Sequence, residues 1–197
     1  MTLISSPLRV LLIPLMAIWL ASCSTTVNTR HVTYLDHDFP FTLPDPVWTQ
    51  KDKTVLQQVT LTRGGQRHNF NAILELKRER VKIALLDVTG GRAFDIDWTS
   101  SNLKVSKSDK IPDEIDGSLI LAQIVLAFWP VEQVKKGLPV NVELEQTHSG
   151  RMLKNKNGTI MTIRSLGGNP WTSQSEILNR IHNVQFLISS NVSGGGK

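Results

Sequence analysis

The sequence predicts a mainly β domain of the α+β class, in which a curved antiparallel sheet forms a half-open barrel and a helical insertion acts as its lid or plug. Apolar and polar residues alternate in successive segments from Val55 onward, and glycine-containing turns separate the first of these segments. One almost wholly apolar stretch, Leu119 to Trp129, interrupts the alternation. A period of two with such turns is typical of antiparallel strands that bury one face.

Residues 1–22 are typical of a secretory signal peptide. Arg9 supplies a positive charge, and the apolar run from Val10 to Leu20 follows it. This run is shorter than the roughly 20 residues that a membrane-spanning helix needs. Small residues precede Cys23, as expected at a cleavage site. We therefore expect residues 1–22 to be removed on export.

The cysteine at the end of this signal indicates lipidation. Leu20-Ala21-Ser22-Cys23 resembles the bacterial lipobox, in which the cysteine is acylated, and Cys23 is the only cysteine of the chain. A lone free thiol would be unusual in an exported protein, and lipidation would consume it. A plain signal peptide with a chance cysteine is the alternative. Ser24 occupies the position where aspartate resembles an inner-membrane retention signal, so we expect an outer-membrane anchor facing the periplasm.

The charge of the chain is mildly basic. The chain has 22 Lys and Arg residues against 17 Asp and Glu residues, and loss of Arg9 with the signal leaves an excess of four. This excess could favour anionic lipid head groups, or it could be ordinary solubility charge. The chain shows no basic run with interleaved aromatic residues, so we expect no nucleic-acid partner.

We divide the chain into four parts. Residues 1–22 are the signal, residues 23–47 a lipidated N-terminus and flexible tether, residues 48–192 the β domain, and residues 193–197 a disordered tail. Pro40, Pro44 and Pro46 and the lack of any helical or strand period support the tether. A short strand near Phe39 to Leu43 is the alternative for part of it.

The elements of the domain follow from the pattern in order. We expect five strands at 55–61, 70–76, 81–85, 94–98 and 103–105, a helix at 119–129 and a second short helix at 131–138. Asp116 and Ser118 suit a helix start, and Pro130 ends or kinks the helix. Further strands are expected at 140–144, at 151–156 and 159–164 around Asn157-Gly158, and at 176–178 and 184–189. Residues 175–182 could instead form a helical turn.

Together these features resemble a known family. The lipobox, the tether, the meander and the segment Leu126-Ala127-Phe128-Trp129-Pro130 look like uncharacterised outer-membrane lipoproteins encoded beside aryl-polyene biosynthesis genes. The resemblance covers roughly Val55 to Ser189. It implies a fold similar to the lipoprotein carriers LolA and LolB, whose curved sheet and helices enclose a cavity for acyl chains. LolB is itself a lipoprotein, but no acyl-binding motif can be matched residue by residue.

The resemblance and the apolar inner faces together predict a binding cavity. Its expected lining is Phe70, Leu74, Ile83, Leu85, Phe94, Ile96, Trp98, Val142 and Leu144 from the strands, with Ile124, Phe128 and Trp129 from the helix. An acyl chain of about 16 carbons exposes on the order of 12 kcal/mol of apolar surface in water, at about 0.8 kcal/mol per methylene. Only a dry cavity can offset this cost. The alternative is that these residues simply pack against one another.

Enzymatic signatures are weak in this sequence. The histidines are scattered, and the chain lacks the nucleophile elbow, the phosphate-binding loop and the zinc-protease motif. Asp95 and Asp97 share one strand face and could form a carboxylate pair for acid–base work or cation binding, but that face should be solvated. We therefore expect neither catalysis nor a cofactor or metal.

The leading hypothesis is a lipid-anchored acceptor or carrier of acyl chains from a lipid or lipoprotein, such as palmitate chains or a polyene lipid. A periplasmic LolA-like carrier is the expected partner, and we expect a monomer. A structural or interaction lipoprotein with a filled core is the second hypothesis. A hydrolase or acyltransferase acting on an envelope lipid is the third.

Overall fold

The computed structural model describes residues 31–36, 39–48, 51–113 and 115–193. The predicted signal peptide, Cys23 and the last four residues lie outside the described residues.

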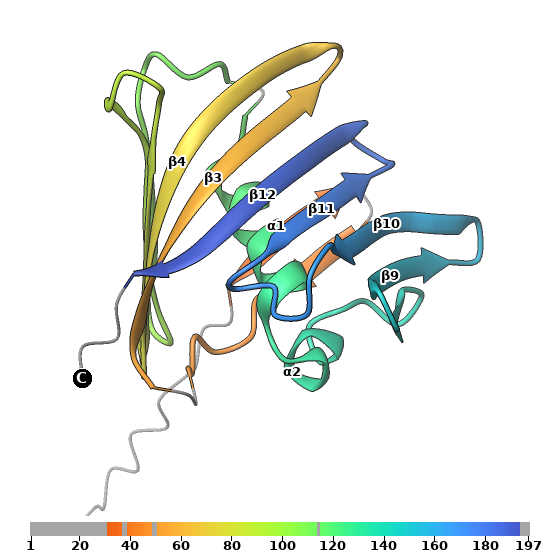
Figure 1. The fold of residues 1–197 in the computed structure, drawn as a ribbon. Coiled ribbons are helices and arrows are strands. Elements are labelled where there is room, and N and C mark those ends of the chain that lie inside the picture. Colours follow the sequence, from red (N-terminus) through yellow and green to blue (C-terminus); the bar gives the residue numbers. More distant parts are fainter. Residues whose placement is uncertain (1–30, 37–38, 49–50, 114, 194–197) are drawn as a thin grey trace, which may run out of the picture.

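One antiparallel sheet of ten strands forms the body of the domain (Figure 1). Its spatial order is β7-β6-β5-β4-β3-β12-β11-β10-β9-β8. The strands are β3 (Lys53–Arg63), β4 (Gln66–Lys77), β5 (Arg80–Leu86), β6 (Arg92–Thr99), β7 (Leu103–Lys107), β8 (Glu143–Thr147), β9 (Gly150–Asn155), β10 (Gly158–Ser165), β11 (Gln174–Asn179) and β12 (Val184–Ser193). Strands β7 and β8 stand at opposite edges, so the sheet is not closed. The predicted class, mainly β with a half-open antiparallel sheet, is confirmed.

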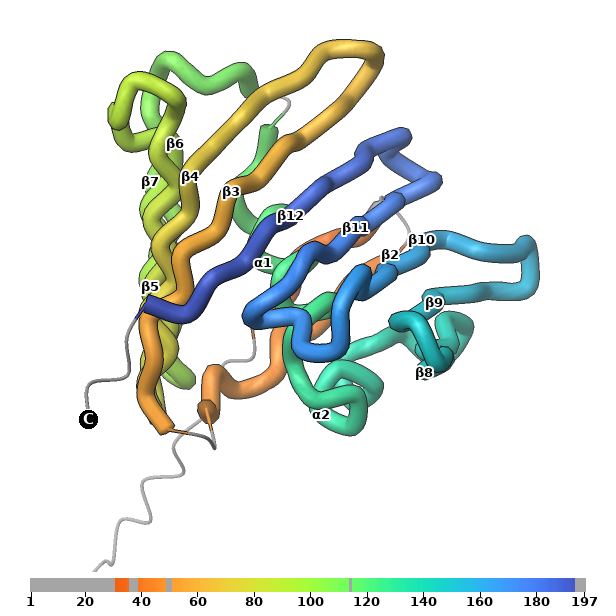
Figure 2. The backbone as a smooth tube through the Cα atoms, in the orientation of Figure 1, coloured from red at the N-terminus to blue at the C-terminus, as the bar shows by residue number. Residues whose placement is uncertain are grey.

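The pairing of β12 with β3 joins the two halves of the chain. It runs from Val184 opposite Arg63 to Ser193 opposite Thr54, and places the last strand beside the first strand of the meander. The sheet thus continues from one meander into the other, and it bends around the helix between them (Figure 2).

Helix α1 (Gly117–Phe128) lies on the inner side of this bend. It begins where the Asp116 side chain accepts a hydrogen bond from the Ser118 backbone N–H, and Pro130 follows its end. Ten of its residues are buried, which explains why its sequence is apolar on every side. Helix α2 (Val131–Lys135) follows directly and is shorter than predicted. Within the described residues, no helix has the length and apolar character needed to cross a membrane.

A second, two-stranded sheet lies in the segment predicted as the tether. Strands β1 (Val32–Asp36) and β2 (Phe39–Thr42) pair antiparallel, and Leu35, Phe41 and Leu43 are buried in the core. The Thr42 backbone N–H donates to the carbonyl of Gly137 at the end of α2. Residues 32–36 and 39–43 therefore pack as part of the fold, and β2 matches the short strand that the sequence offered as the alternative near Phe39 to Leu43.

Three further local predictions have different outcomes. The strand expected at 140–144 begins only at Glu143. A turn precedes it, in which the Val142 N–H donates to the Pro139 carbonyl, and this turn leaves Val140 exposed. Residues 174–179 form β11, so the alternative of a helical turn at 175–182 is excluded. The hairpin predicted at Asn157-Gly158 is confirmed.

Candidate functional site

The site lies between α1 and the inner face of the sheet. A small apolar cavity of about 20 Å³ opens there, which is room for about one water molecule. It is lined by Gln57, Val59 and Leu61 of β3, Phe70 and Ala72 of β4, Leu85 of β5, Ile177 of β11, Phe186 and Ile188 of β12, and Ile120, Gln123 and Ile124 of α1. The lining therefore joins five strands from the middle of the sheet to one helix.

All twelve residues predicted to line a cavity are buried. Phe70, Leu85 and Ile124 line the observed cavity. The other nine pack in the same core but do not face it: Leu74, Ile83, Phe94, Ile96, Trp98, Phe128, Trp129, Val142 and Leu144. The inner faces were thus placed on the correct side of the sheet, and this free space lies beside the middle of α1, from Ile120 to Ile124.

The volume of this cavity shows that the interior is filled in the present conformation. Pockets that hold drug-sized ligands enclose about 300–1,000 Å³. A guest hydrocarbon of about 16 carbons therefore fits only if α1 moves away from the sheet. Such a movement would uncover the apolar side chains of α1 and of the strands that line the cavity.

Aromatic rings close the space beyond the C-terminal end of α1. We call Trp48, Trp98, Phe128, Trp129 and Trp171 the aromatic cluster. The ring centroids of Trp129 lie 6.0 Å from those of Trp48 and 5.5 Å from those of Trp98, and Phe128 lies 4.7 Å from Trp171. Trp48 and Trp171 meet edge to face at 5.4 Å. Such pairs stabilise a fold beyond the area they bury.

A lysine covers this cluster on its outer side. The Lys53 ammonium lies 4.5 Å from the ring centroid of Trp48 and 4.2 Å from that of Trp171, which is cation–π distance. Partial burial lowers the pKa of Lys53 below its ordinary value. The sequence prediction missed Trp48 and Trp171, because each stands alone outside the alternating strand pattern.

The opposite end of the cavity approaches the surface. A pocket of about 340 Å³ is lined by Leu61, Arg63, Gly64, Gln66 and His68 around the β3–β4 turn, and by Pro112 and Ile115 ahead of α1. Leu61 lines both this pocket and the buried cavity. His68 stacks on Phe70, which also lines the cavity. Leu61 therefore lies between the buried cavity and the 340 Å³ pocket.

Arg151 contacts the last turn of α1. Its guanidinium donates a hydrogen bond of 2.8 Å to the carbonyl of Leu126. Burial lowers the pKa of Arg151 to about 10, so the side chain stays charged at neutral pH. Arg151 also lines a pocket of about 600 Å³ with His148, Ser175 and the 165–168 loop. A cation near the C-terminal end of a helix complements its dipole and holds α1 in place.

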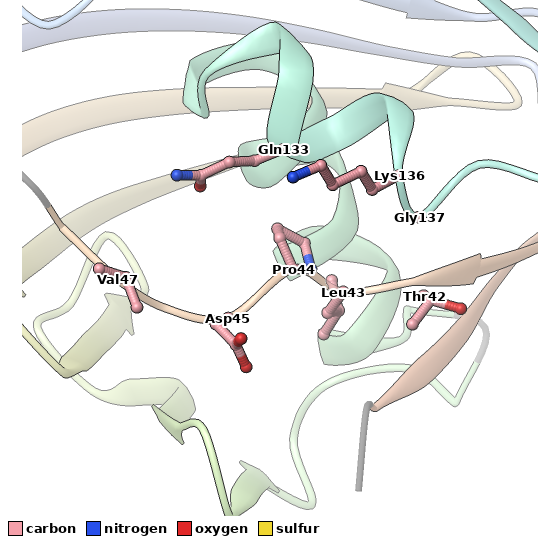
Figure 3. A pocket seen from close by; sticks show the side chains of 8 residues that line it. All are labelled: Thr42, Leu43, Pro44, Asp45, Val47, Gln133, Lys136 and Gly137. Atoms are coloured by element: carbon pink, nitrogen blue, oxygen red, sulfur yellow. The ribbon is translucent and has the colours of Figure 1, made fainter. Parts of the chain in front are cut away.

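A further pocket of about 270 Å³ lies between α2 and the segment after β2 (Figure 3). Gln133 of α2 and Lys136, the residue directly after that helix, lie over the segment that carries Leu43, Pro44 and Asp45. Its lining mixes polar and apolar groups and is separate from the space beside α1.

A family profile described as "Protein of unknown function (DUF3261)" matches residues 54–191. The chain belongs to this family. The matched residues run from β3 to β12 and include both helices, so they contain the whole lining of the cavity.

The solved structures that resemble this DUF3261 chain share little sequence identity with it. A LolA superfamily protein from Nitrosomonas europaea is 9% identical, with 78% of this chain and 90% of that chain covered and a TM-score of 0.44. A DUF1329 family protein from Desulfovibrio piger is 9% identical, with 75% and 87% covered and a TM-score of 0.38. No curated protein matched the chain.

In this DUF3261 chain, Asp95 and Asp97 do not form a carboxylate pair, because each forms an ion pair with a different arginine. Arg80 donates two hydrogen bonds to Asp97 and holds the pKa of that carboxyl below its ordinary value, and Arg92 pairs with Asp95. All four side chains lie on the outer face of the sheet. Across the described residues, no group of His, Cys, Asp and Glu could hold a metal ion. These pairs are therefore ordinary surface ion pairs.

Proposed function

We propose that this protein binds acyl chains of a lipid or lipoprotein between α1 and the inner face of its sheet, and serves as their acceptor or carrier. The observation that carries the proposal is the apolar boundary between α1 and the sheet. It is lined almost only by hydrocarbon, is closed at one end by the aromatic cluster, and approaches the 340 Å³ pocket at the other. The proposal requires neither catalysis nor a cofactor.

Binding in this proposal exchanges one set of apolar contacts for another. Displacing α1 from the sheet uncovers buried side chains, which costs free energy, and the guest chain covers them again. Transfer of a 16-carbon chain from water contributes about 12 kcal/mol, at about 0.8 kcal/mol per methylene. That contribution is large enough to offset partial exposure of a helix of twelve residues.

The test uses a soluble form, residues 24–197, which contains every residue that the structure describes. Recovered from the bacterial periplasm, it should carry a lipid that native mass spectrometry detects. Ala72 lines the cavity from β4, and Ala72→Leu fills it from the sheet side. We expect this change to lower lipid occupancy at least tenfold.

Ala84→Leu is the matched control, since Ala84 lies on the outer face of the neighbouring strand β5. Lipid occupancy of this control should equal that of the unchanged protein, and circular dichroism should show both variants folded. Unchanged occupancy in Ala72→Leu would place the lipid elsewhere. A lipid-free unchanged protein, with no uptake of added acyl chains, would end the carrier proposal.

A structural or interaction protein with a filled core is the second candidate, and the small volume of the cavity favours it. The lipid-occupancy experiment above distinguishes the two candidates, because a protein with a filled core takes up no acyl chain. An enzyme acting on an envelope lipid is disfavoured by the pairing of Asp95 and Asp97 with arginines.

We also propose that Cys23 anchors the protein in the outer membrane, facing the periplasm, where a periplasmic LolA-like carrier could hand over its cargo. Lipobox cysteines usually carry three acyl chains, and one chain alone binds a membrane only marginally. Cys23→Ser should abolish incorporation of labelled palmitate. It should also move the protein out of the outer-membrane fraction on a sucrose gradient.

Retention of label and of membrane association in Cys23→Ser would contradict the anchor. Ser24→Asp is the companion variant, expected to keep the label but to shift the protein to the inner membrane.

A further inference from the structure

Two glutamines face the apolar cavity from its opposite walls. Gln57 comes from β3 and is 3% exposed, and Gln123 comes from α1 and is 2% exposed. The other lining residues are all apolar. Each wall of the cavity therefore carries a buried amide group at a position where packing alone favours an apolar side chain.

The hydrogen bonds of these amides are incomplete. The Gln57 Nε2 group donates to the Ser190 hydroxyl at 3.0 Å, which leaves Oε1 of Gln57 without a partner among the residues that the structure describes. Neither Nε2 nor Oε1 of Gln123 has a partner in that part of the chain. Buried polar groups are almost always hydrogen-bonded, since leaving one unpaired costs free energy. The unpaired atoms thus comprise one N–H donor group and two carbonyl acceptors.

The lining of the cavity determines which ligand group could form hydrogen bonds with these unpaired amide atoms. No Lys, Arg or His lines the cavity, so an ionised carboxylate would be buried there without a counter-charge, which is very costly. A neutral carbonyl group suffers no such cost. It can accept a hydrogen bond from Nε2 of Gln123, and an amide N–H can donate to a glutamine Oε1.

We propose that Gln57 and Gln123 bind the neutral carbonyl linkage, ester or amide, that joins a guest acyl chain to the rest of its lipid. This inference rests on the proposed function and adds the chemical class of the ligand. The two amides orient the linkage, while the apolar lining takes up the hydrocarbon. An acyl chain linked in this way is favoured over an alkane and over a free fatty acid.

The experiment measures the Kd of residues 24–197 for methyl palmitate, N-methylpalmitamide, palmitate and hexadecane, each delivered from cyclodextrin. The unchanged protein should bind the ester or the amide about tenfold more tightly than hexadecane. Gln123→Leu should remove this preference, so that the ester and the amide bind no more tightly than hexadecane does. Because it removes unpaired buried groups, Gln123→Leu should not lower the thermal unfolding midpoint, as the loss of a merely structural residue would.

Gln57→Leu is combined with Ser190→Ala, since the hydroxyl would otherwise lose its donor. This pair should weaken amide binding more than ester binding. Gln58→Leu is the matched control, being the next residue on β3 with its side chain exposed on the outer face, and it should change no Kd.

The outcomes separate the two proposals. Binding of all four probes with equal Kd in every variant overturns the role of the glutamines and leaves an acyl carrier without linkage recognition. A water molecule alone on the two amides would also give no preference for the ester or amide, and overturns the inference in the same way. Binding of none of the probes overturns the proposed function itself.

Discussion

Replacing Trp129 by alanine is expected to lower the free energy of unfolding by about 3–5 kcal/mol, the range found for large aromatic residues in cores. Trp129 is fully buried and lies at ring-contact distance from both Trp48 and Trp98. Its removal leaves a void between three elements that are distant in sequence, which cannot collapse without moving a strand. Urea denaturation of residues 24–197 measures the change.

Trp129→Phe is the control for this prediction. The Trp129 Nε1 group is buried without a partner among the described residues, so phenylalanine loses volume but also removes an unpaired donor. We expect it to cost clearly less than alanine does. A loss below about 1 kcal/mol for Trp129→Ala would mean that the aromatic cluster does not hold the end of α1 against the sheet, by comparison with the usual cost of such truncations.

Replacing Phe41 by alanine is expected to cost a similar amount, about 3–5 kcal/mol. Phe41 lies on β2 and is fully buried, and its ring packs close to Gly137 at the end of α2. If the segment before residue 47 were a flexible tether, the same substitution would cost almost nothing. Thermal or urea unfolding therefore tests whether β1 and β2 belong to the folded domain.

Tyr34→Ala is the matched control, because Tyr34 lies on β1 of the same two-stranded sheet with 59% of its surface exposed. Surface substitutions usually change stability by less than about 0.5 kcal/mol. Equal small losses in the two variants would restore the tether interpretation.

The sheet and α1 could be predicted because their patterns are local. Val55, Val59 and Leu61 alternate along β3, and the opposite faces of such a strand differ in burial by simple geometry. The apolar run of α1 has the length of a helix and an N-terminal aspartate cap. Both signals are contained in a short window of sequence.

The parts that were missed depend on distant contacts. Strand β1 was not predicted, and β2 was expected only as the alternative of a short strand near Phe39 to Leu43. The two strands have five and four residues and include Pro40, and β1 packs against α1. The pairing of β12 with β3 joins residues more than a hundred positions apart. No local pattern fixes such a partner.

The candidate site was predicted in outline only. The inner strand faces gave the correct set of buried residues, but the free volume depends on how closely α1 approaches each strand, which periodicity does not determine. The sequence did contain one indication of the site, in Gln57 and Gln123. Each is a polar residue at an apolar position of its pattern, Gln57 between Val55 and Val59 and Gln123 inside the apolar helix.

The most direct measurement is the set of intermolecular nuclear Overhauser effects between ¹³C-labelled methyl palmitate and residues 24–197. We expect the ligand methylenes to contact methyl groups of Ile124 on α1 and of Ile177 and Ile188 on the sheet, which all line the cavity. Contacts confined to Leu56 and Leu187, apolar residues exposed on the outer face, would show that the guest never enters the space beneath α1.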